Sequence, residues 1–173
     1  MSIVWYNSPA ELLGINPSRE FLSWLTYTGS TTKRLEKEFN INLVVKLLSR
    51  GNVPSWHPDY NNIPRFSWSR NSYLYVEDKP WMLASIVLEP GAILKKDMQQ
   101  VFTLGENPIG NLLYSGSKVE RSDVQFALVN SSTLPLDFIS NTPLVAKKST
   151  ISSRFGCFYI LEIFLPHGIL HNI

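Results

Sequence analysis

The chain has 173 residues, of which 44% are hydrophobic and 17% are charged. This composition is typical of a globular domain and excludes a disordered chain, which needs low hydrophobicity and high net charge. The formal net charge is only +2, and the basic pairs Lys33-Arg34, Lys95-Lys96 and Lys147-Lys148 are scattered along the sequence. Nucleic-acid binding is therefore not expected, because it normally uses a concentrated basic surface.

The cysteine content and the N-terminal sequence bear on the compartment. Cys157 is the only cysteine, which excludes an internal disulfide and indicates a reducing compartment. The start, Met1-Ser2-Ile3-Val4-Trp5-Tyr6, lacks the features of signal and transit peptides, and no stretch reaches the roughly 20 apolar residues of a membrane span. We expect a soluble protein of the bacterial cytoplasm or, for an organelle-encoded chain, of the plastid stroma.

The N-terminal part is predicted to be helical. Ser8-Pro9-Ala10-Glu11 begins a helix of barely two turns that Gly14 ends, with a serine cap and a glutamate at the capping-box position. Asn16-Pro17 begins a second helix with Phe21, Leu22, Trp24 and Leu25 on its apolar side. Ser30 caps a third helix that runs through Lys33, Leu35 and Phe39.

The rest of the chain alternates strands with short helices. Strands are predicted at residues 43–48, 68–76, 81–88, 119–129, 144–152 and 155–165, with a loop at 51–64 and a turn at 77–80. Asp97 is predicted to cap a helix that Gly105 ends, and Asn107-Pro108 to begin another. This order predicts an α+β fold in which residues 1–173 form a single domain around a mostly antiparallel sheet.

Several kinds of site are missing from the sequence. It contains no GxxxxGK[ST], GxGxxG or GxSxG pattern. His167 and His171 have i,i+4 spacing, but they follow Pro166 and no HExxH pattern or cysteine ligand accompanies them. Because a zinc site needs three or four ligands, we expect no metal site.

Glu162 is the most informative polar residue. In a strand it shares a face with Phe158, Ile160 and Phe164, and the opposite face is also apolar, which indicates an interior strand. Burial of a carboxyl group raises its pKa, which suits an acid or base that works near neutrality. The alternative is a structural glutamate, either with its tip in water or paired with a basic residue.

Arg70 and two helix starts are candidates for anion binding. Arg70 lies near the start of a strand, in Ser67-Trp68-Ser69-Arg70-Asn71-Ser72-Tyr73, and a guanidinium can hold a carboxylate with two parallel hydrogen bonds. Backbone N–H groups at helix starts, here residues 29–32 and 107–110, also bind anions. A surface arginine and ordinary helix caps would give the same pattern.

Taken in order, these segments resemble the chorismate pyruvate-lyase family of bacteria and of algal plastid genomes. The resemblance spans roughly residues 20–166, and its motifs are Leu22-Ser23-Trp24-Leu25, Gly29-Ser30-Thr31-Thr32-Lys33-Arg34-Leu35, Arg70 eleven residues before Trp81 in Lys79-Pro80-Trp81, Leu104-Gly105-Glu106-Asn107-Pro108-Ile109-Gly110, and Glu162-Ile163-Phe164-Leu165-Pro166. It implies an α+β domain with helical flaps over a buried ligand. It also implies a lyase that needs no metal or cofactor and eliminates pyruvate from chorismate to leave 4-hydroxybenzoate for quinone biosynthesis (ubiquinone or plastoquinone).

The resemblance also implies roles for individual residues. Arg70 and the backbone N–H groups of Thr31 and Ile109 would hold the ring carboxylate, so the side chains of Thr31 and Ile109 are free to vary. Glu162 would face the opposite end of the ring, near the ether oxygen, as the proton-handling residue. Arg70 and Glu162 are thus the expected catalytic residues, and the expected partners are chorismate and 4-hydroxybenzoate, bound by a monomer.

Two departures from the family pattern concern the second carboxylate of chorismate, on the enolpyruvyl group. Ser85 stands where the family often has an arginine, and Val145-Ala146-Lys147-Lys148 replaces a Trp-Gly-Arg-Arg stretch. Two alternatives to a lyase that yields 4-hydroxybenzoate remain open at this point. One is a non-catalytic aromatic-acid-binding domain, as in some transcription regulators of the same fold, and the other is a lyase that yields 3-hydroxybenzoate.

Overall fold

A computed structural model describes residues 3–12, 14–52, 68–88, 90–115, 118–133 and 143–166. The α-helices are α1 (Arg19–Leu25), α2 (Thr31–Phe39), α3 (Gln99–Phe102) and α4 (Ile109–Leu113). The 3-10 helices are η1 (Pro9–Glu11), η2 (Pro90–Leu94), η3 (Lys96–Met98) and η4 (Ser131–Thr133). The strands are β1 (Val44–Asn52), β2 (Trp68–Val76), β3 (Lys79–Leu88), β4 (Glu120–Val129), β5 (Leu144–Ser153) and β6 (Gly156–Phe164).

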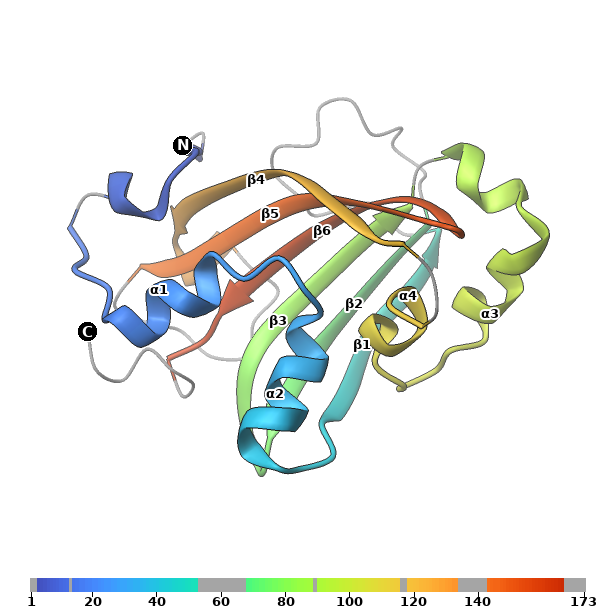
Figure 1. The fold of residues 1–173 in the computed structure, drawn as a ribbon, viewed down its shortest axis with the longest axis horizontal. Coiled ribbons are helices and arrows are strands. Elements are labelled where there is room, and N and C mark those ends of the chain that lie inside the picture. Colours follow the sequence, from blue (N-terminus) through green and yellow to red (C-terminus); the bar gives the residue numbers. More distant parts are fainter. Residues whose placement is uncertain are drawn as a thin grey trace.

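The strands form one antiparallel sheet of six, in the order β1-β2-β3-β6-β5-β4. Helices α1, α2 and α4 lie on one face of this sheet (Figure 1). The C-terminal strand β6 occupies the middle of the sheet between β3 and β5, as the two apolar faces around Glu162 predict. The predicted α+β fold with a mostly antiparallel sheet is confirmed.

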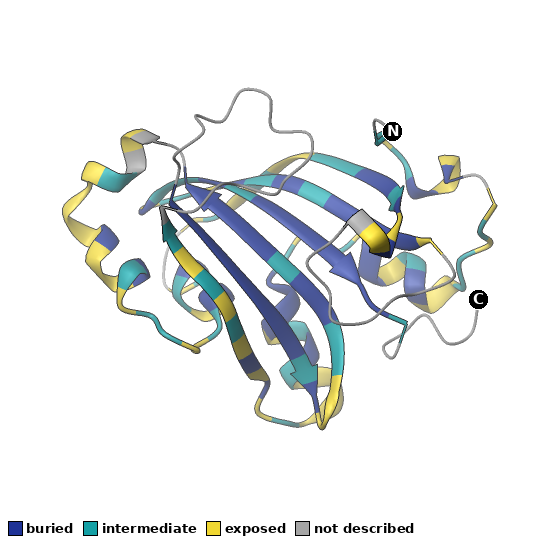
Figure 2. Ribbon diagram, turned by 180° about the vertical axis from the view of Figure 1, so that it is seen from behind, coloured by how far each residue is buried: buried dark blue, intermediate teal, exposed yellow. Residues whose placement is uncertain are grey.

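Burial follows the position of each strand in the sheet. The inner strands β2 and β6 are buried along most of their length, whereas the edge strand β1 alternates between exposed residues and buried or half-buried ones (Figure 2). Edge strands keep one row of side chains in water, so this alternation is the expected pattern.

Two apolar clusters lie on the helix-covered face. One joins α1 and α2 to the sheet and includes Phe21, Trp24 and Phe164. The other joins the segment from η2 to α4 to the sheet and includes Met98, Leu113 and Ile160. A third cluster, which includes Leu83, Leu161 and Ile163, lies on the opposite face. The two helical segments are thus anchored separately, with the centre of the sheet between them.

Serine caps begin the first two α-helices. The Oγ of Ser18 accepts a hydrogen bond from the N–H of Phe21 at 3.1 Å, and the Oγ of Ser30 accepts one from the N–H of Lys33 at 3.3 Å. The predicted cap at Ser30 is confirmed, whereas the second helix begins at Arg19, after Ser18, later than the predicted start.

Two predicted helices are shorter than expected. The first is a single 3-10 turn, Pro9–Glu11, although both hydrogen bonds of its capping box are present. Asp97 does not cap a helix, because it lies inside η3, and α3 ends at Phe102. Residues 96–102 are nevertheless helical without a break, and Gly105, which was predicted to end this helix, has a left-handed backbone conformation with a φ of 60°. The carbonyl groups of Gly105 and Asn107 accept hydrogen bonds from Arg70, a distant contact that local propensity does not reveal.

Strand β1 is longer than its predicted range of 43–48. Gly51 and Asn52, assigned to a loop from the sequence, pair with Ser69 and Trp68 of β2, so pairing with a neighbouring strand overrides their turn propensity. The remainder of that predicted loop, residues 53–64, lies outside the described residues. None of the helices in the described ranges is both long and apolar enough to cross a membrane.

Candidate active site

Strand register brings the polar candidates together at the centre of the sheet. One row of paired residues runs from Arg70 on β2 through Ile86 and Ile160 to Ser149 on β5. The adjacent row runs through Ser72, Ala84, Glu162 and Lys147. Residues two apart along a strand point to the same face, so both rows face the helices.

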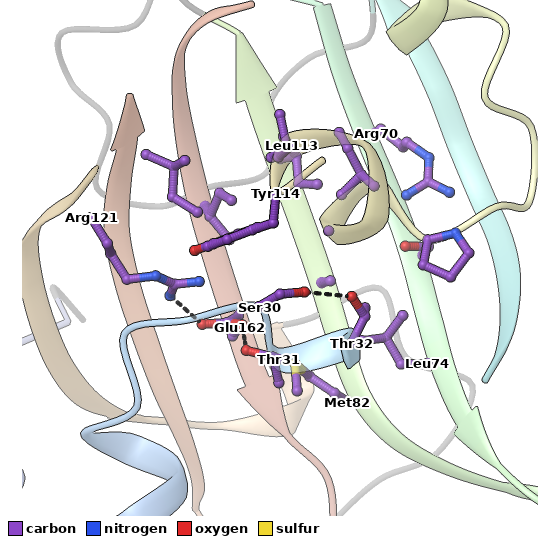
Figure 3. Close-up of a pocket in the computed structure, with 18 residues that line it drawn as sticks. Ser30, Thr31, Thr32, Arg70, Leu74, Met82, Leu113, Tyr114, Arg121 and Glu162 are labelled. Carbon is purple, nitrogen blue, oxygen red and sulfur yellow. Dashed lines mark hydrogen bonds and ion pairs between the residues drawn. The ribbon is translucent and has the colours of Figure 1, made fainter. Parts of the chain in front are cut away.

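All four residues predicted for the site border a single cavity between this face and the helices (Figure 3). Arg70 lies toward one end of the cavity, whereas Glu162 and Arg121 lie toward the other (Figure 3). Thr31 and Ile109 are the first residues of α2 and α4 and border the cavity. The starts of these two helices cover the cavity, and we call this cover the lid. The wall between the two ends is mostly apolar and includes Leu74, Met82, Ile86, Leu113, Ile151 and Ile160.

Arg70 is buried, with 3% of its surface exposed, so the alternative of a surface arginine is wrong. Its Nη2 donates hydrogen bonds to the carbonyl groups of Gly105 and Asn107, both at 3.0 Å. Burial and the nearby Arg50 lower the pKa of Arg70 to about 10, so the guanidinium stays charged at neutral pH. Among the described residues no carboxylate forms an ion pair with Arg70.

Glu162 is also buried, and three side chains surround its carboxylate. Thr31 donates a hydrogen bond from Oγ1 to Oε1 at 2.5 Å, and Arg121 donates one from Nη1 to Oε2 at 2.9 Å. The Nζ of Lys147 lies 3.8 Å from the same Oε2. Of the two structural alternatives for Glu162, the pairing with a basic residue is the one that the structure contains.

These contacts overturn the expected protonation of Glu162. Burial by itself raises the pKa of this carboxyl group, but the charges of Arg121 and Lys147, together with the hydrogen bonds from Thr31 and Arg121, outweigh burial and lower the pKa to about 2. The predicted raised pKa is therefore wrong. At neutral pH Glu162 is a carboxylate that can accept a proton or a hydrogen bond but has no proton to donate.

Thr31 has a side-chain role that the sequence did not suggest. Its side chain was expected to be free to vary, with only the backbone N–H involved in binding. In the structure its hydroxyl is one of the three groups that contact Glu162, and serine would keep the same hydroxyl donor. The proposed binding through the backbone N–H of Thr31 stays a prediction.

Arg121 and Lys147 give this end of the cavity a net positive charge. Burial lowers the pKa of Lys147 to about 8, against the raising effect of Glu162. Burial opposes the charge of Arg121 too, but Glu162 and Tyr114 outweigh it and raise the pKa of Arg121. At neutral pH two buried cations thus face one carboxylate. A buried glutamate between two apolar faces has to be paired or held protonated, but the sequence alone does not identify the residues that pair with it.

The two helical segments meet above the cavity. The Oγ of Ser30 and the Oγ1 of Thr32, at the start of α2, are 2.9 Å apart. They lie so close to Gly110 of α4 that a Cβ atom there would overlap both hydroxyl groups. Tyr114, just after α4, donates a hydrogen bond to the carbonyl of Thr28 at 3.2 Å. These contacts hold the two segments together as a closed lid.

The departure at Ser85 does not affect the cavity wall. Ser85 lies between Ala84 and Ile86, both of which border the cavity, so its side chain points to the opposite face of the sheet. There its Oγ donates a hydrogen bond to Oδ1 of Asn71. Within the other departure, residues 145–148, Lys147 points toward Glu162 and keeps a positive charge at this end of the cavity.

Metal ligands do not gather at the cavity. Among the residues that the structure describes, no three His, Cys, Asp or Glu side chains come together in a group that could hold a metal ion. The three histidines, His57, His167 and His171, lie outside the described residues.

Comparisons with known proteins identify the family of the chain. The family profile described as chorismate lyase matches residues 2–172. A probable chorismate pyruvate-lyase of Shewanella loihica is 28% identical over 171 residues, which cover 95% of this chain and 88% of that protein. A chorismate pyruvate-lyase of Sodalis glossinidius is 34% identical over 137 residues, which cover 75% of this chain and 72% of that protein.

A solved structure supports the fold. The crystal structure of a gene product of Staphylococcus aureus superposes with a TM-score of 0.50 at 14% identity and covers 82% of this chain and 92% of that one. At this identity the likeness concerns the fold alone. The family match, which extends over nearly the whole chain, shows that the protein belongs to the chorismate lyase family.

Proposed function

We propose that this protein eliminates pyruvate from chorismate and releases 4-hydroxybenzoate. The observation that carries the proposal is the charge of the cavity, which holds Arg70 at one end and two cations against one carboxylate at the other. Chorismate carries a carboxylate on its ring and a second one on its enolpyruvyl group. A dianion with an apolar ring between its charges matches a cavity with excess positive charge at both ends and an apolar wall between them.

The Arg70 end is proposed to hold the ring carboxylate. Thr31 and Ile109 are the first residues of their helices, and N–H groups at that position have no acceptor inside the helix. Both residues border the cavity together with Arg70, so two amides and a guanidinium are placed to bind one carboxylate.

The proposed reaction is an elimination that makes the ring aromatic. The C4–H bond breaks and its electron pair forms the new C3–C4 double bond. The C3–O bond breaks and its pair leaves with the enolpyruvate oxygen, and the enolpyruvate takes a proton at its methylene carbon to become pyruvate. Aromatisation supplies the driving force, while the protein orients the substrate and excludes water.

Glu162 is proposed to act at the C4 end of the ring. Because it is ionised, it serves as the acceptor, either for the C4 proton or for a hydrogen bond from the C4 hydroxyl group. Its two oxygens are fixed by Thr31 and Arg121, so its orientation is set before the substrate arrives.

We further propose that the protein acts as a monomer and that its product is used in quinone biosynthesis. Light scattering on the purified protein checks the monomeric state. If 4-hydroxybenzoate feeds quinone biosynthesis, the gene should restore quinone in a bacterial strain that lacks its own chorismate lyase.

A chorismate assay with product identification tests the central claim. Purified protein should release 4-hydroxybenzoate and pyruvate in equal amounts without added metal and with EDTA present. Formation of 3-hydroxybenzoate would keep the family and change the product. Tight binding of 4-hydroxybenzoate without any turnover of chorismate would instead indicate a binding domain, and the lyase proposal would be abandoned.

A further inference from the structure

The Glu162 end of the cavity holds one more positive charge than its own residues require. Arg121 and Lys147 both approach the same oxygen, Oε2, at 2.9 and 3.8 Å. Their side chains are 4% and 1% exposed, so solvent does little to screen them. One cation is enough to compensate the carboxylate, and an uncompensated buried charge is unfavourable unless a counter-ion arrives.

Arg121 also has hydrogen-bonding capacity that the described residues do not use. Its Nη1 donates to Ser149 at 3.1 Å and to Glu162, and its guanidinium also hydrogen-bonds the side chain of Tyr114. Its buried Nε has no hydrogen-bond partner among the described residues. A guanidinium carries five N–H groups, and Arg121 borders the cavity directly. Unused donors and unbalanced charge therefore occur on the same side chain.

Lys147 contacts Glu162 but does not border the cavity. Its Nζ donates to the carbonyl of Tyr27 at 2.6 Å. Lys147 can stay beside Glu162 while Arg121 turns part of its guanidinium toward a ligand. Its contribution to ligand binding is charge, whereas Arg121 supplies the contact.

We infer that Arg121, supported by Lys147, binds the enolpyruvyl carboxylate of the substrate, an assignment that rests on the proposed function. Arg70 on β2 and Glu162 on β6 are separated by two strand spacings, or about 10 Å, which is the scale needed to place the two carboxylates of one chorismate at opposite ends. With the second carboxylate bound, this end of the cavity becomes neutral.

The inference also explains how a carboxylate with a low pKa can act as a base. A substrate carboxylate placed at Arg121 would share the two cations that stabilise ionised Glu162 and would add a negative charge beside it. Both effects raise the pKa of Glu162, so substrate binding would make this carboxylate more basic at the moment when a proton has to be accepted.

The test compares two ligands that differ in the second carboxylate. The KM for chorismate is measured alongside the Kd for 4-hydroxybenzoate, which lacks the enolpyruvyl group, in the wild-type protein and in Lys147→Met. The variant keeps a side chain of similar length, and Arg121 still compensates Glu162. We expect the KM for chorismate to rise about ten- to a hundredfold and the Kd for 4-hydroxybenzoate to change less than about threefold.

Two further variants provide the controls. Lys147→Arg keeps the charge and should retain a KM within about threefold of the wild type, while Arg121→Met should repeat the selective effect of Lys147→Met with Lys147 left to compensate Glu162. Arg70→Ala should behave differently and weaken the binding of chorismate and of 4-hydroxybenzoate together, because both carry the ring carboxylate.

The outcomes separate the inference from the proposed function. If the wild-type protein converts chorismate and both neutral variants keep its KM, the assignment of Arg121 is wrong and the lyase activity stands. Equal weakening of chorismate and 4-hydroxybenzoate would mean that the two cations are merely structural, which also overturns the assignment. If the wild-type protein neither binds nor converts chorismate, the proposed function itself fails.

Discussion

The hydroxyl group of Thr31 lies 2.5 Å from Oε1 of Glu162 and joins the first residue of α2 to the middle strand of the sheet. The same residue is proposed to offer its backbone N–H to the ring carboxylate of the substrate. One residue of the lid therefore contacts the buried carboxylate and also borders the space for the ligand. The position of the lid and the orientation of Glu162 are consequently coupled.

Replacing Thr31 by valine should destabilise the closed lid. Valine keeps the shape of threonine but removes the donor, and a hydrogen bond to a charged group contributes about 1.5–3 kcal/mol. We expect the free energy of unfolding, measured with urea, to fall by that amount and kcat to fall as well. Thr31→Ser keeps the hydroxyl group and should stay within about 1 kcal/mol of the wild type. Equal stability of the two variants would show that the contact contributes nothing.

Replacing Glu162 by glutamine should abolish most of the turnover. Glutamine keeps the shape but removes the ionised acceptor, and the loss of a general base typically lowers kcat by a factor of about a hundred or more. The variant also leaves Arg121 and Lys147 without a counter-charge, so the free energy of unfolding should fall by about 3 kcal/mol. The assay is therefore run at a temperature where circular dichroism shows the variant folded. Near-normal turnover there would exclude proton transfer at this residue.

The sequence predicts the secondary structure well where the pattern of an element's own residues decides its conformation. Strand β2 has the predicted bounds, Trp68–Val76, and its residues are buried along almost their whole length. The helix predicted from Asp97 to Leu104 is helical from Lys96 to Phe102, as η3 followed by α3. The strand and the helix could be read from the pattern of their own residues, whereas the hydrogen bonds from Arg70 to Gly105 and Asn107 could not, because Arg70 is far away in sequence.

The same distinction applies to the cavity. Glu162 could be singled out because a charge within an apolar strand is conspicuous, and Arg70 because a guanidinium near the start of a strand can hold a carboxylate. Arg121 could not, because it lies near the start of β4 beside Glu120 and Ser122 and looks like any surface arginine. Its partner Glu162 is 41 residues away, and only the sheet order places β5 alone between their two strands. The protonation of Glu162 was misjudged for the same reason, since burial was foreseen and its cationic neighbours were not.

Adding a methyl group at Gly110 should force the lid open. A Cβ atom there would overlap the hydroxyl groups of Ser30 and Thr32, and overpacking of this kind typically destabilises a protein by about 1–3 kcal/mol. We expect Gly110→Ala to lower the free energy of unfolding by that amount and to weaken the binding of 4-hydroxybenzoate. Gly91→Ala is the matched control, because a Cβ at Gly91 meets no atom within 4 Å. If both variants were as stable as the wild type, the lid would not be tightly closed at Gly110.

Raising the pH should weaken the binding of chorismate before it affects the fold. Burial lowers the pKa of Lys147 to about 8 from an ordinary value of 10.5, and the groups that face it are Glu162 on β6, Arg121 on β4 and Arg34 on α2. Above pH 8 Lys147 loses its proton and the Glu162 end of the cavity loses its excess charge. We expect the KM for chorismate at pH 9 to be about five- to tenfold higher than at pH 7.

Stability should move in the opposite direction over the same range. Between pH 8 and 10.5 the unfolded chain binds the Lys147 proton more tightly than the folded protein does, so this residue makes folding more favourable as the pH rises. A loss of affinity accompanied by a constant or higher midpoint in urea therefore separates the loss of charge from unfolding. In Lys147→Arg, whose guanidinium stays protonated, the KM should remain flat up to pH 9. A wild-type KM that is equally flat would mean that the charge of Lys147 does not reach the substrate.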